Sequence, residues 1–151
     1  MDGSIRFRFA GREDIPLILR FIKELADYEG MLDQVVATEE LLDQWLFEKQ
    51  KAEVLLGSCG GETVGFALFF HNFSTFLGRA GIYLEDLYVC PEYRERGFGK
   101  AFLNQLASIA VERGCGRLEW WTGISPALTS IWAWAPRPWT NGRFTGLTGT
   151  G

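Results

Sequence analysis

Residues 82–100 read IYLEDLYVCPEYRERGFGK, and this stretch holds the strongest structural signals in the chain. Its first part, Ile82 to Val89, is rich in β-branched and aromatic residues, which predicts a strand. Pro91 ends that strand because proline lacks the N–H group that a ladder needs. A polar turn follows, and Gly97 and Gly99 open the next helix. The stretch therefore predicts a strand, a glycine-bearing turn and a helix in direct succession.

The turn carries Arg94, Gly97 and Gly99 in the pattern RxxGxG. The first N–H groups of a helix have no carbonyl partner within the helix, so such a terminus binds anions. Glycine permits close approach to the backbone, and Arg96 and Lys100 add positive charge suited to a phosphate or pyrophosphate. An ordinary glycine-containing loop with a solvated run of charges is equally compatible with this spacing.

Two other phosphate-binding motifs do not fit the turn. A Walker loop requires GxxxxGK before Ser or Thr, whereas Gly99 and Lys100 precede Ala101 and the upstream glycine is missing. A dinucleotide-binding fingerprint requires a third glycine where this chain has Phe102, although Glu119 partly imitates its ribose-binding acid. A nucleotide-binding domain of another α/β fold is therefore only a third interpretation of the chain.

Upstream of this stretch the sequence predicts a strand and two helices. Ser4 to Phe9 alternates polar and apolar residues, which is the period of a half-buried strand. Asp14 to Gly30 has the spacing of an amphipathic helix, with apolar positions at Ile15, Ile18, Leu19, Ile22, Leu25 and Tyr28. Thr38 is the predicted N-cap of a second helix, whose apolar side comprises Leu41, Leu42, Trp45 and Leu46.

The remaining segments complete a mixed fold. Two strand-like runs, Glu53 to Cys59 and Thr63 to His71, flank a glycine pair that predicts a hairpin turn, and Asn72 to Gly81 is interpreted as a loop. Downstream, a helix is predicted over Gly97 to Arg113 and a strand over Arg117 to Trp121. The order β-α-α-β-β-β-α-β, ending in a right-handed parallel crossover, predicts an α/β (α+β) fold with a mixed central sheet flanked by helices.

Composition excludes several classes of protein. The 151 residues include 15 Lys plus Arg and 19 Asp plus Glu, and 47% are hydrophobic, which is typical of one globular domain stable without metal or disulfide. A net charge of -4 argues against a nucleic-acid partner. Because no apolar run approaches the roughly 20 residues that span a bilayer and no leader precedes Ile5, we expect no membrane partner and a cytoplasmic location.

Cysteine and histidine offer no metal or nucleophile pattern. Cys59, Cys90 and Cys115 lie too far apart for a CxxC site and form an odd set, so we interpret them as reduced thiols that mostly pack. His71 has no metal-ligand or nucleophile constellation near it in the sequence, and we interpret it as a loop or structural residue. We therefore expect no metal site.

The acidic phrase YLED and the later RERGFGK together resemble the acyl-CoA-binding motif of the GNAT N-acetyltransferase superfamily. Within it the chain is most similar to diamine acetyltransferases of the spermidine/spermine and thialysine type. The similarity covers about residues 5–121 and includes YEG at 28–30, FST at 73–75, GRAGIYLEDLYV at 78–89 and PEYRERGFGK at 91–100. RxxGxG alone is moderately specific, whereas the ordered set is strongly so.

This resemblance implies a homodimeric enzyme that transfers an acetyl group from acetyl-CoA to a primary amine of a small diamine, polyamine or lysine-like substrate. The pyrophosphate of the co-substrate would lie on the turn and helix start, and the backbone of the preceding strand would hold the pantetheine and acetyl group. The implied cofactor-binding residues are Leu87, Tyr88, Val89, Arg94, Glu95, Arg96, Gly97, Phe98, Gly99 and Lys100.

In this family the amine attacks the thioester directly, and a primary amine, with a pKa of about 10.4, must first lose a proton. By similarity Glu85 is the candidate base and Asp86 a contact for a second amine. Glu29, with Asp27 and Asp33, adds to a cation-attracting site, although these acids also suit a solvated surface. Adjacent residues of an ideal strand face opposite sides, so Glu85 and Asp86 both reach the substrate only if the strand bulges. Otherwise one of them is a structural ion-pair partner.

The character of the chain changes after Trp121, so we divide it into an acetyltransferase core at 1–121 and an aberrant segment at 122–151. That segment has six Thr, five Gly, three Trp and no acid, and no helical or alternating period continues beyond Ile131. The family continues here with a helix and two strands that carry an Asn for the cofactor and a Tyr that protonates the leaving thiolate. This chain has neither at those places, because its four tyrosines lie upstream.

We interpret residues 122–151 as the product of a shifted reading frame. The third base of each codon, read with the first two of the next, allows DWNKPSIDFYLGLGAEAMDEWTVYRL, which is a family-like ending. Some letters are forced, because Trp121-Thr122 requires Asp and Trp132-Ala133 and Trp134-Ala135 each require Gly. A genuine alternative C-terminus is the competing interpretation.

If residues 122–151 are the true product, we expect weak CoA binding and impaired or absent acetyl transfer. We also expect a sheet that is one or two strands short, with exposed edges. The alternative function is then a CoA- or polyamine-binding protein with little or no catalysis.

Overall fold

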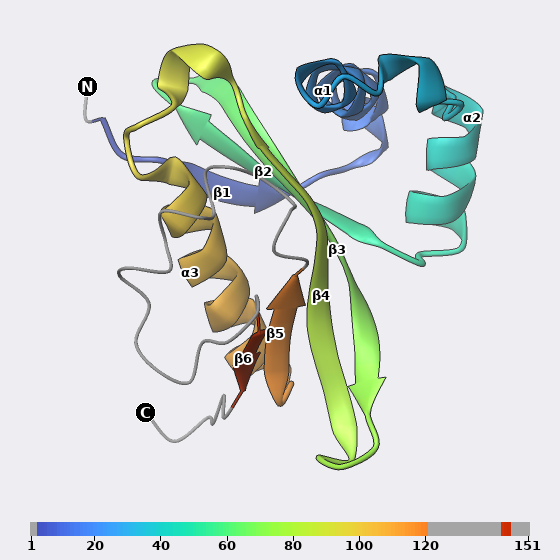
Figure 1. The fold of residues 1–151 in the computed structure, drawn as a ribbon, viewed down its shortest axis with the longest axis vertical. Helices are drawn as coiled ribbons and strands as arrows, with labels where there is room; N and C mark the ends of the chain where they lie inside the picture. Colours follow the sequence, from blue (N-terminus) through green and yellow to red (C-terminus); the bar gives the residue numbers. More distant parts are fainter. Residues whose placement is uncertain (1–2, 121–142, 146–151) are drawn as a thin grey trace.

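A six-stranded sheet with the order β1-β2-β3-β4-β5-β6 runs through the computed structural model, which describes residues 3–120 and 143–145 (Figure 1). The first four strands pair antiparallel in turn, β5 is parallel to β4, and β6 is antiparallel to β5. The strands are β1 (Arg6–Phe9), β2 (Glu53–Cys59), β3 (Glu62–Ser74), β4 (Arg79–Val89), β5 (Arg117–Trp120) and β6 (Arg143–Thr145). The predicted mixed sheet, with its parallel crossover, is confirmed.

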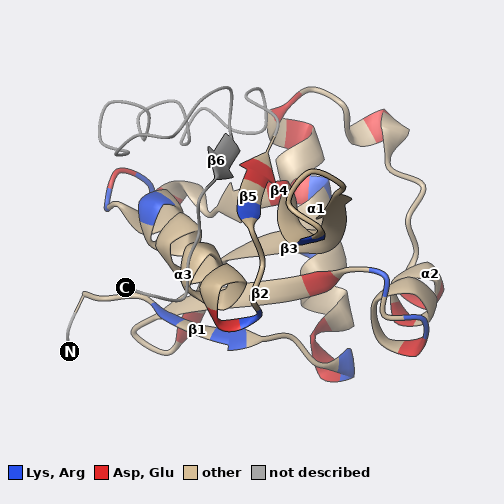
Figure 2. Cartoon of the chain, turned by 90° about the horizontal axis from the view of Figure 1, so that it is seen from below, with Lys and Arg blue, Asp and Glu red and all other residues tan. Residues whose placement is uncertain are grey.

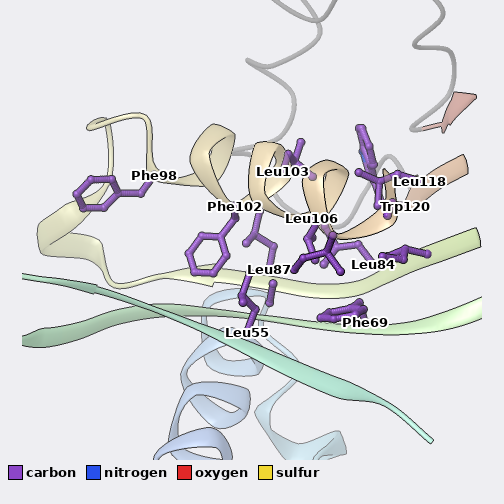
Figure 3. Close-up of a cluster of buried hydrophobic side chains, with 14 of the residues drawn as sticks. Leu55, Phe69, Leu84, Leu87, Phe98, Phe102, Leu103, Leu106, Leu118 and Trp120 are labelled. Atoms are coloured by element: carbon purple, nitrogen blue, oxygen red, sulfur yellow. The ribbon is translucent and has the colours of Figure 1, made fainter. Parts of the chain in front are cut away.

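Helices cover both faces of this sheet (Figures 1 and 3). On one face, α1 (Ile15–Tyr28) and α2 (Glu39–Leu42) pack over β2 and β3, and α2 continues as a π-helical turn (Asp43–Glu48). On the other face lies α3 (Phe98–Glu112), which joins β4 to β5. Short 3-10 turns occupy Arg12–Asp14, Leu32–Gln34 and Pro91–Tyr93. No helix within the described ranges is both long and apolar enough to cross a membrane.

The end of α1 is closed by its own backbone. Gly30 has a left-handed φ of 72°, and its N–H donates to the carbonyl of Asp27, while the N–H of Met31 donates to Ala26. This pattern is a Schellman motif, which satisfies the last carbonyls of a helix and reverses the chain. The predicted apolar stripe is wrong at Tyr28, which is 52% exposed because the helix has by then passed beyond the sheet-facing core.

The second helix is capped as predicted, since the Oγ1 of Thr38 accepts a hydrogen bond from the N–H of Leu41 at 3.2 Å. Its predicted apolar side is wrong at two positions. Leu42 and Leu46 are buried, whereas Leu41 and Trp45 are exposed. Residues four apart share one stripe on a helix, and a single stripe is all that this short element turns toward the core.

Both hairpins follow from backbone geometry. Gly60 and Gly61 adopt left-handed φ values of 61° and 85°, which a two-residue turn between β2 and β3 requires. The predicted loop over Asn72–Gly81 is wrong, because pairing continues to Ser74 opposite Arg79 and only residues 75–78 turn. Cross-strand partners thus override the local polar composition. Gly81 fits this pairing because a Cβ there would meet the Oδ1 of Asn72 at 2.7 Å.

The larger core lies between α3 and the sheet (Figure 3). Apolar side chains on one face of α3 pack against alternate residues of β2 to β5, and the most buried of them are Leu55, Phe69, Leu84, Leu87, Phe102, Leu103, Leu106 and Leu118. Cys59 and Cys115 are buried in this core and Cys90 packs partly against the other one, all as free thiols, which confirms their packing role. His71 lies in β3, where its Nε2 is 3.4 Å from the Nη1 of Arg113, so its structural interpretation holds.

The predicted aberrant segment lies largely outside the described residues, which omit 121–142 and 146–151. The described part, β6, pairs with β5 through Leu118 opposite Phe144. We expected a sheet one or two strands short, with exposed edges, and within the described residues β6 covers the β5 edge from Arg117 to Glu119. Backbone pairing needs no alternating side-chain pattern, so periodicity gave no signal for it.

Candidate active site

β4 loses its second neighbour halfway along its length. Its pairing with β5 covers only Ile82 to Leu84 opposite Leu118 to Trp120. Beyond Leu84, within the described ranges, residues 85–89 pair with β3 alone. Among the described residues, the C-terminal half of β4 therefore has one backbone edge without a partner strand, which we call the open edge. This edge leads directly into the turn before α3 (Figure 1).

The direction of the backbone groups on this edge follows from the antiparallel ladder. The N–H of Cys90 donates to the carbonyl of Val64 at 2.7 Å, so Cys90 faces β3. Because facing alternates along such a pair, Leu87 and Val89 direct their N–H and C=O groups to the open edge. Tyr88 directs its backbone to β3 and its ring into the core beneath α1.

A β-bulge separates the two halves of β4. The register passes from Leu68 opposite Asp86 to Phe69 opposite Leu84, which leaves Glu85 as the extra residue. Leu84 and Leu87 both enter the α3-side core, so neither carboxylate between them does. The bulge is the condition under which Glu85 and Asp86 can both reach one substrate. Glu85 is exposed and Asp86 is half-buried.

Three carboxylates come together at the bulge. Burial and the negative charges of Glu85 and Glu29 raise the pKa of Asp86 from 3.8 to about 6. Glu29 follows the last residue of α1, and the acidic stretch of β4 lies beside that helix (Figure 2). Asp27 and Asp33 are not among the charges that raise the pKa of Asp86. Three neighbouring carboxylates are suited to a cation, and a cation held there would draw Asp86 toward its ionised form.

The turn between the open edge and α3 has two left-handed residues, Glu95 with φ 65° and Gly97 with φ 79°. Such alternation directs successive N–H groups into one concavity, which suits an anion. The N–H of Ala101 makes the first intrahelical bond of α3, to Gly97 at 3.0 Å, so the N–H groups of Phe98 and Gly99 have no acceptor within the helix. The ring of Phe98 is buried in the core and anchors the turn.

The two arginines of the turn are already engaged within the protein. Arg94 donates from Nε to the carbonyl of Val89 at 2.9 Å, and its guanidinium lies 4.4 Å from the ring centroid of Tyr28 and 5.5 Å from that of Tyr88. Arg96 lies over the ring of Tyr93 at 4.9 Å. Sequence reasoning assigned Arg94 to a phosphate and missed this internal role.

A separate pocket of about 380 Å³ lies at the other edge of the sheet, where β1 ends. It contains none of the predicted site residues and is lined by Phe9, Ala10, Leu46, Phe47, Gln50, Ala52, Glu53, Val54 and Arg113. No group of three or more His, Cys, Asp or Glu residues that could hold a metal ion occurs in the described part of the chain.

Known proteins resemble the chain over most of its length. A sequence profile of the acetyltransferase (GNAT) family matches residues 19–131. The thialysine N-epsilon-acetyltransferase of Sus scrofa is 39% identical over 129 residues, which cover 78% of this chain and 74% of that protein. The L-ornithine N5-acetyltransferase of Arabidopsis thaliana is 29% identical over 161 aligned residues, which cover 76% of this chain and 71% of that protein.

Solved structures share the architecture at lower identity. An acetyltransferase of Clostridium acetobutylicum, solved with acetyl-CoA, superposes with a TM-score of 0.69 and 17% identity, covering 91% of this chain and 94% of that one. This likeness shows the fold alone.

Proposed function

Because this chain belongs to the GNAT acetyltransferase family, we propose that it transfers the acetyl group of acetyl-CoA to a primary amine of a small diamine, polyamine or lysine-like substrate. One observation carries this proposal. The open edge of β4 begins at a bulge that bears Glu85 and Asp86 and ends at a turn whose backbone suits an anion. The acidic residues, the open edge and the turn therefore follow one another along the chain.

The residues present suit acetyl-CoA. The backbone groups of Leu87 and the N–H of Val89 would pair with the amides of a pantetheine chain laid along the open edge, whereas the carbonyl of Val89 already accepts from Arg94. The N–H groups of the turn up to Gly99, with Arg96 and Lys100, would face the pyrophosphate. Bound there, acetyl-CoA would supply an activated acetyl thioester whose carbonyl lies beside the bulge.

Glu85 is the proposed base for the attacking amine. It is exposed, so it can pass a proton to water, and the bulge directs it away from the α3-side core. Glu85 takes the first proton from the ammonium group, and the neutral amine nitrogen then forms the bond to the acetyl carbon while the bond from that carbon to sulfur breaks. The nitrogen loses its second proton to solvent to give the amide, and the leaving thiolate takes a proton from solvent. Asp86 and Glu29 would hold a second amine as its ammonium ion.

The acceptor class rests on this acidic group and on the relatives. A single ammonium ion needs one carboxylate, whereas three carboxylates favour a substrate with two positive charges. Thialysine and L-ornithine, the substrates in the names of two relatives, each carry two amines.

Residues 1–121 are the proposed catalytic core, and residues 122–151 the proposed product of a shifted frame. In that case the thiolate acid of the family is missing, and acetyl transfer by this chain is slow or absent. A protein that binds CoA or a polyamine without turnover is the second candidate, favoured by the lack of a tyrosine after residue 93. We also propose a cytoplasmic homodimer that has no nucleic-acid or membrane partner.

The test is acetyl-CoA consumption with a panel of diamines, spermidine and thialysine, beside a chain whose ending is restored to the shifted frame. Activity in the restored chain alone supports both the acetyltransfer and the frameshift. Equal activity in both contradicts the frameshift consequence, and no consumption in either contradicts acetyl transfer to these amines. A coding sequence with no insertion or deletion near Trp121 contradicts the frameshift itself.

A further inference from the structure

The pocket where β1 ends lies apart from the proposed acetyltransfer site, and we call it the edge pocket. Its volume of about 380 Å³ falls within the range of small-molecule sites. Its floor is apolar, since Leu46 and Val54 are buried in the core that α1 covers. Three further lining residues pack against the same core: Ala10, Phe47 and Ala52. The edge pocket therefore has the size and the apolar lining of a ligand site.

One wall of the edge pocket has unusual backbone geometry. In the π-helical turn after α2, the N–H of Lys49 donates to the carbonyl of Gln44 at 2.8 Å. The N–H of Lys51 donates to the carbonyl of Trp45 at 2.9 Å, and between these two bonds Gln50 has a left-handed φ of 52°. Glycine is usual at such a helix end, because a Cβ is strained there. The chain has instead a glutamine that lines the pocket, and both π-turns and strained residues are frequent at functional sites.

The charged residues of the edge pocket neutralise each other. Glu53 accepts two hydrogen bonds from Arg113, one from Nη1 at 2.6 Å and one from Nη2 at 2.9 Å. A charged ligand of either sign would meet a like charge at this pair, so the pair favours an uncharged ligand. Each carboxylate oxygen of Glu53 keeps a lone pair for another donor, and the amide of Gln50 both donates and accepts. These groups are complementary to an amide.

Two aromatic side chains line the same pocket. Phe9 is 48% exposed, and Phe47 is half-buried. The guanidinium of Arg113 lies 5.6 Å from the ring centroid of Phe9, so the polar pair and an accessible ring are neighbours. Aromatic side chains favour stacked or edge-to-face contacts with other rings. The lining therefore suits a flat ring beside a hydrogen-bonding group.

We propose that the edge pocket binds an uncharged planar aromatic molecule that carries a carboxamide group. Its ring lies against Phe9 and Phe47. Its amide lies between Gln50 and the pair of Glu53 with Arg113, where the N–H donates to the carboxylate and the carbonyl accepts from the glutamine. This site is independent of the proposed function, because none of its residues belongs to the acidic group, the open edge or the turn before α3.

The first test is titration of the ¹⁵N-labelled full chain with benzamide, followed by the chemical shifts of its backbone amides. We expect a Kd of about 1 mM, which is ordinary for so small a ligand, with shifts at residues 50–54 and none in the turn at 94–99. Benzoate and benzylamine have the same ring but carry a charge, and they should bind at least about fivefold more weakly. An absence of shifts at residues 50–54, or equal affinity for the three probes, overturns the proposal.

Gln50→Gly separates a binding role from a structural one. Glycine relieves the strained φ, so the variant should melt about 1–4 °C higher. It should nevertheless bind benzamide at least about threefold more weakly, because the amide partner is lost. Lys51→Ala, an exposed neighbour outside the pocket lining, is the control and should leave benzamide affinity unchanged. Unchanged affinity in Gln50→Gly contradicts the proposal.

Glu53→Gln tests the charge balance of the pocket. Without its carboxylate partner, Arg113 carries an uncompensated positive charge and should select an anion. Benzoate should then bind about fivefold more tightly than benzamide, the reverse of the order in the unsubstituted chain. Circular dichroism checks that the variant is folded. A folded variant that still prefers benzamide overturns the assigned role of the pair, and with it the proposal.

Discussion

The two halves of β4 differ in what their surroundings require of them. Residues 79–84 have strands on both sides, and Leu84 is completely buried beneath α3. Residues 85–89 have β3 on one side and the open edge on the other, and they begin with an exposed carboxylate. A single strand thus serves stability in one half and, in the proposed function, ligand contact in the other, and the bulge at Glu85 is the boundary between them.

The largest effect expected from this division is on folding. Leu84→Ala removes a buried side chain between α3 and the sheet and should lower the free energy of unfolding by about 2–5 kcal/mol. Glu85→Ala, one residue away, should change it by less than about 0.5 kcal/mol because the side chain is exposed. Urea denaturation followed by circular dichroism measures both free energies of unfolding. Equal decreases for the two variants would contradict the division of β4 at the bulge.

The second effect is on catalysis, and it is expected for a substitution in the second half of β4 rather than the first. In the chain with the restored ending, Glu85→Gln should lower kcat at least about 100-fold, since general-base catalysis contributes roughly 10²–10⁴-fold. Its melting temperature should stay at the value of the unsubstituted chain. Steady-state kinetics at saturating acetyl-CoA measure the change, and a loss below about fivefold would assign the proton transfer to another group.

A third substitution lies in β3 and acts on the second half of β4, with which that strand pairs. A Cβ at Gly65 would collide with the carbonyl oxygen of Tyr88, which is backbone and cannot yield as a flexible side chain does. Gly65→Ala should therefore cost about 1–3 kcal/mol and displace the open edge. CoA affinity should fall more than the affinity for the amine. Gly61→Ala is the control at the tip of the preceding hairpin, where a Cβ would meet nothing within 4 Å. It should cost stability, because alanine is strained at a φ of 85°, but should leave CoA binding intact.

The smallest effect is a pH dependence set by Asp86. Its pKa is raised to about 6, so amine affinity should rise with pH through that value as the carboxyl ionises, by about tenfold at most. The free energy of unfolding should change in the opposite direction and fall as the pH rises from 3.8 to about 6. The reason is that the folded chain binds the proton of Asp86 more tightly than the unfolded chain in this range. Asp86→Asn should remove the inflection in binding and stabilise the fold at pH 8 but not at pH 3.

Local patterns predicted the elements that depend on local physics. The 3.6-residue spacing located α1 and α3, the capping residue Thr38 located α2, and paired glycines located the first hairpin. The pairing of Asn72 with Gly81 escaped prediction because it depends on a partner strand and on a missing Cβ. The same holds for β6, which its partner β5 defines.

The candidate site divides in the same way. The family resemblance identified Glu85, Asp86 and the turn as candidate site residues. The alternation of side chains along a strand predicted that Glu85 and Asp86 could reach one substrate only at a bulge. The position of the bulge depends on a mismatch between Leu68–Phe69 and Leu84–Asp86, which no single segment reveals. The guanidinium of Arg94 lies over the ring of Tyr28, which belongs to another element. Helical periodicity alone predicted Tyr28 on the buried face of α1, whereas its side chain is exposed.

The long β3–β4 hairpin also bears on how the protein folds. Its strands close through residues 75–78, whereas β1 reaches β2 only by bringing Arg6 to Ser58. Closing a short loop costs less chain entropy than closing a long one, so the hairpin can nucleate ahead of the sheet edge. The register that positions the acidic pair therefore belongs to one of the two strand pairings closed by short turns, the other being the pairing of β2 with β3.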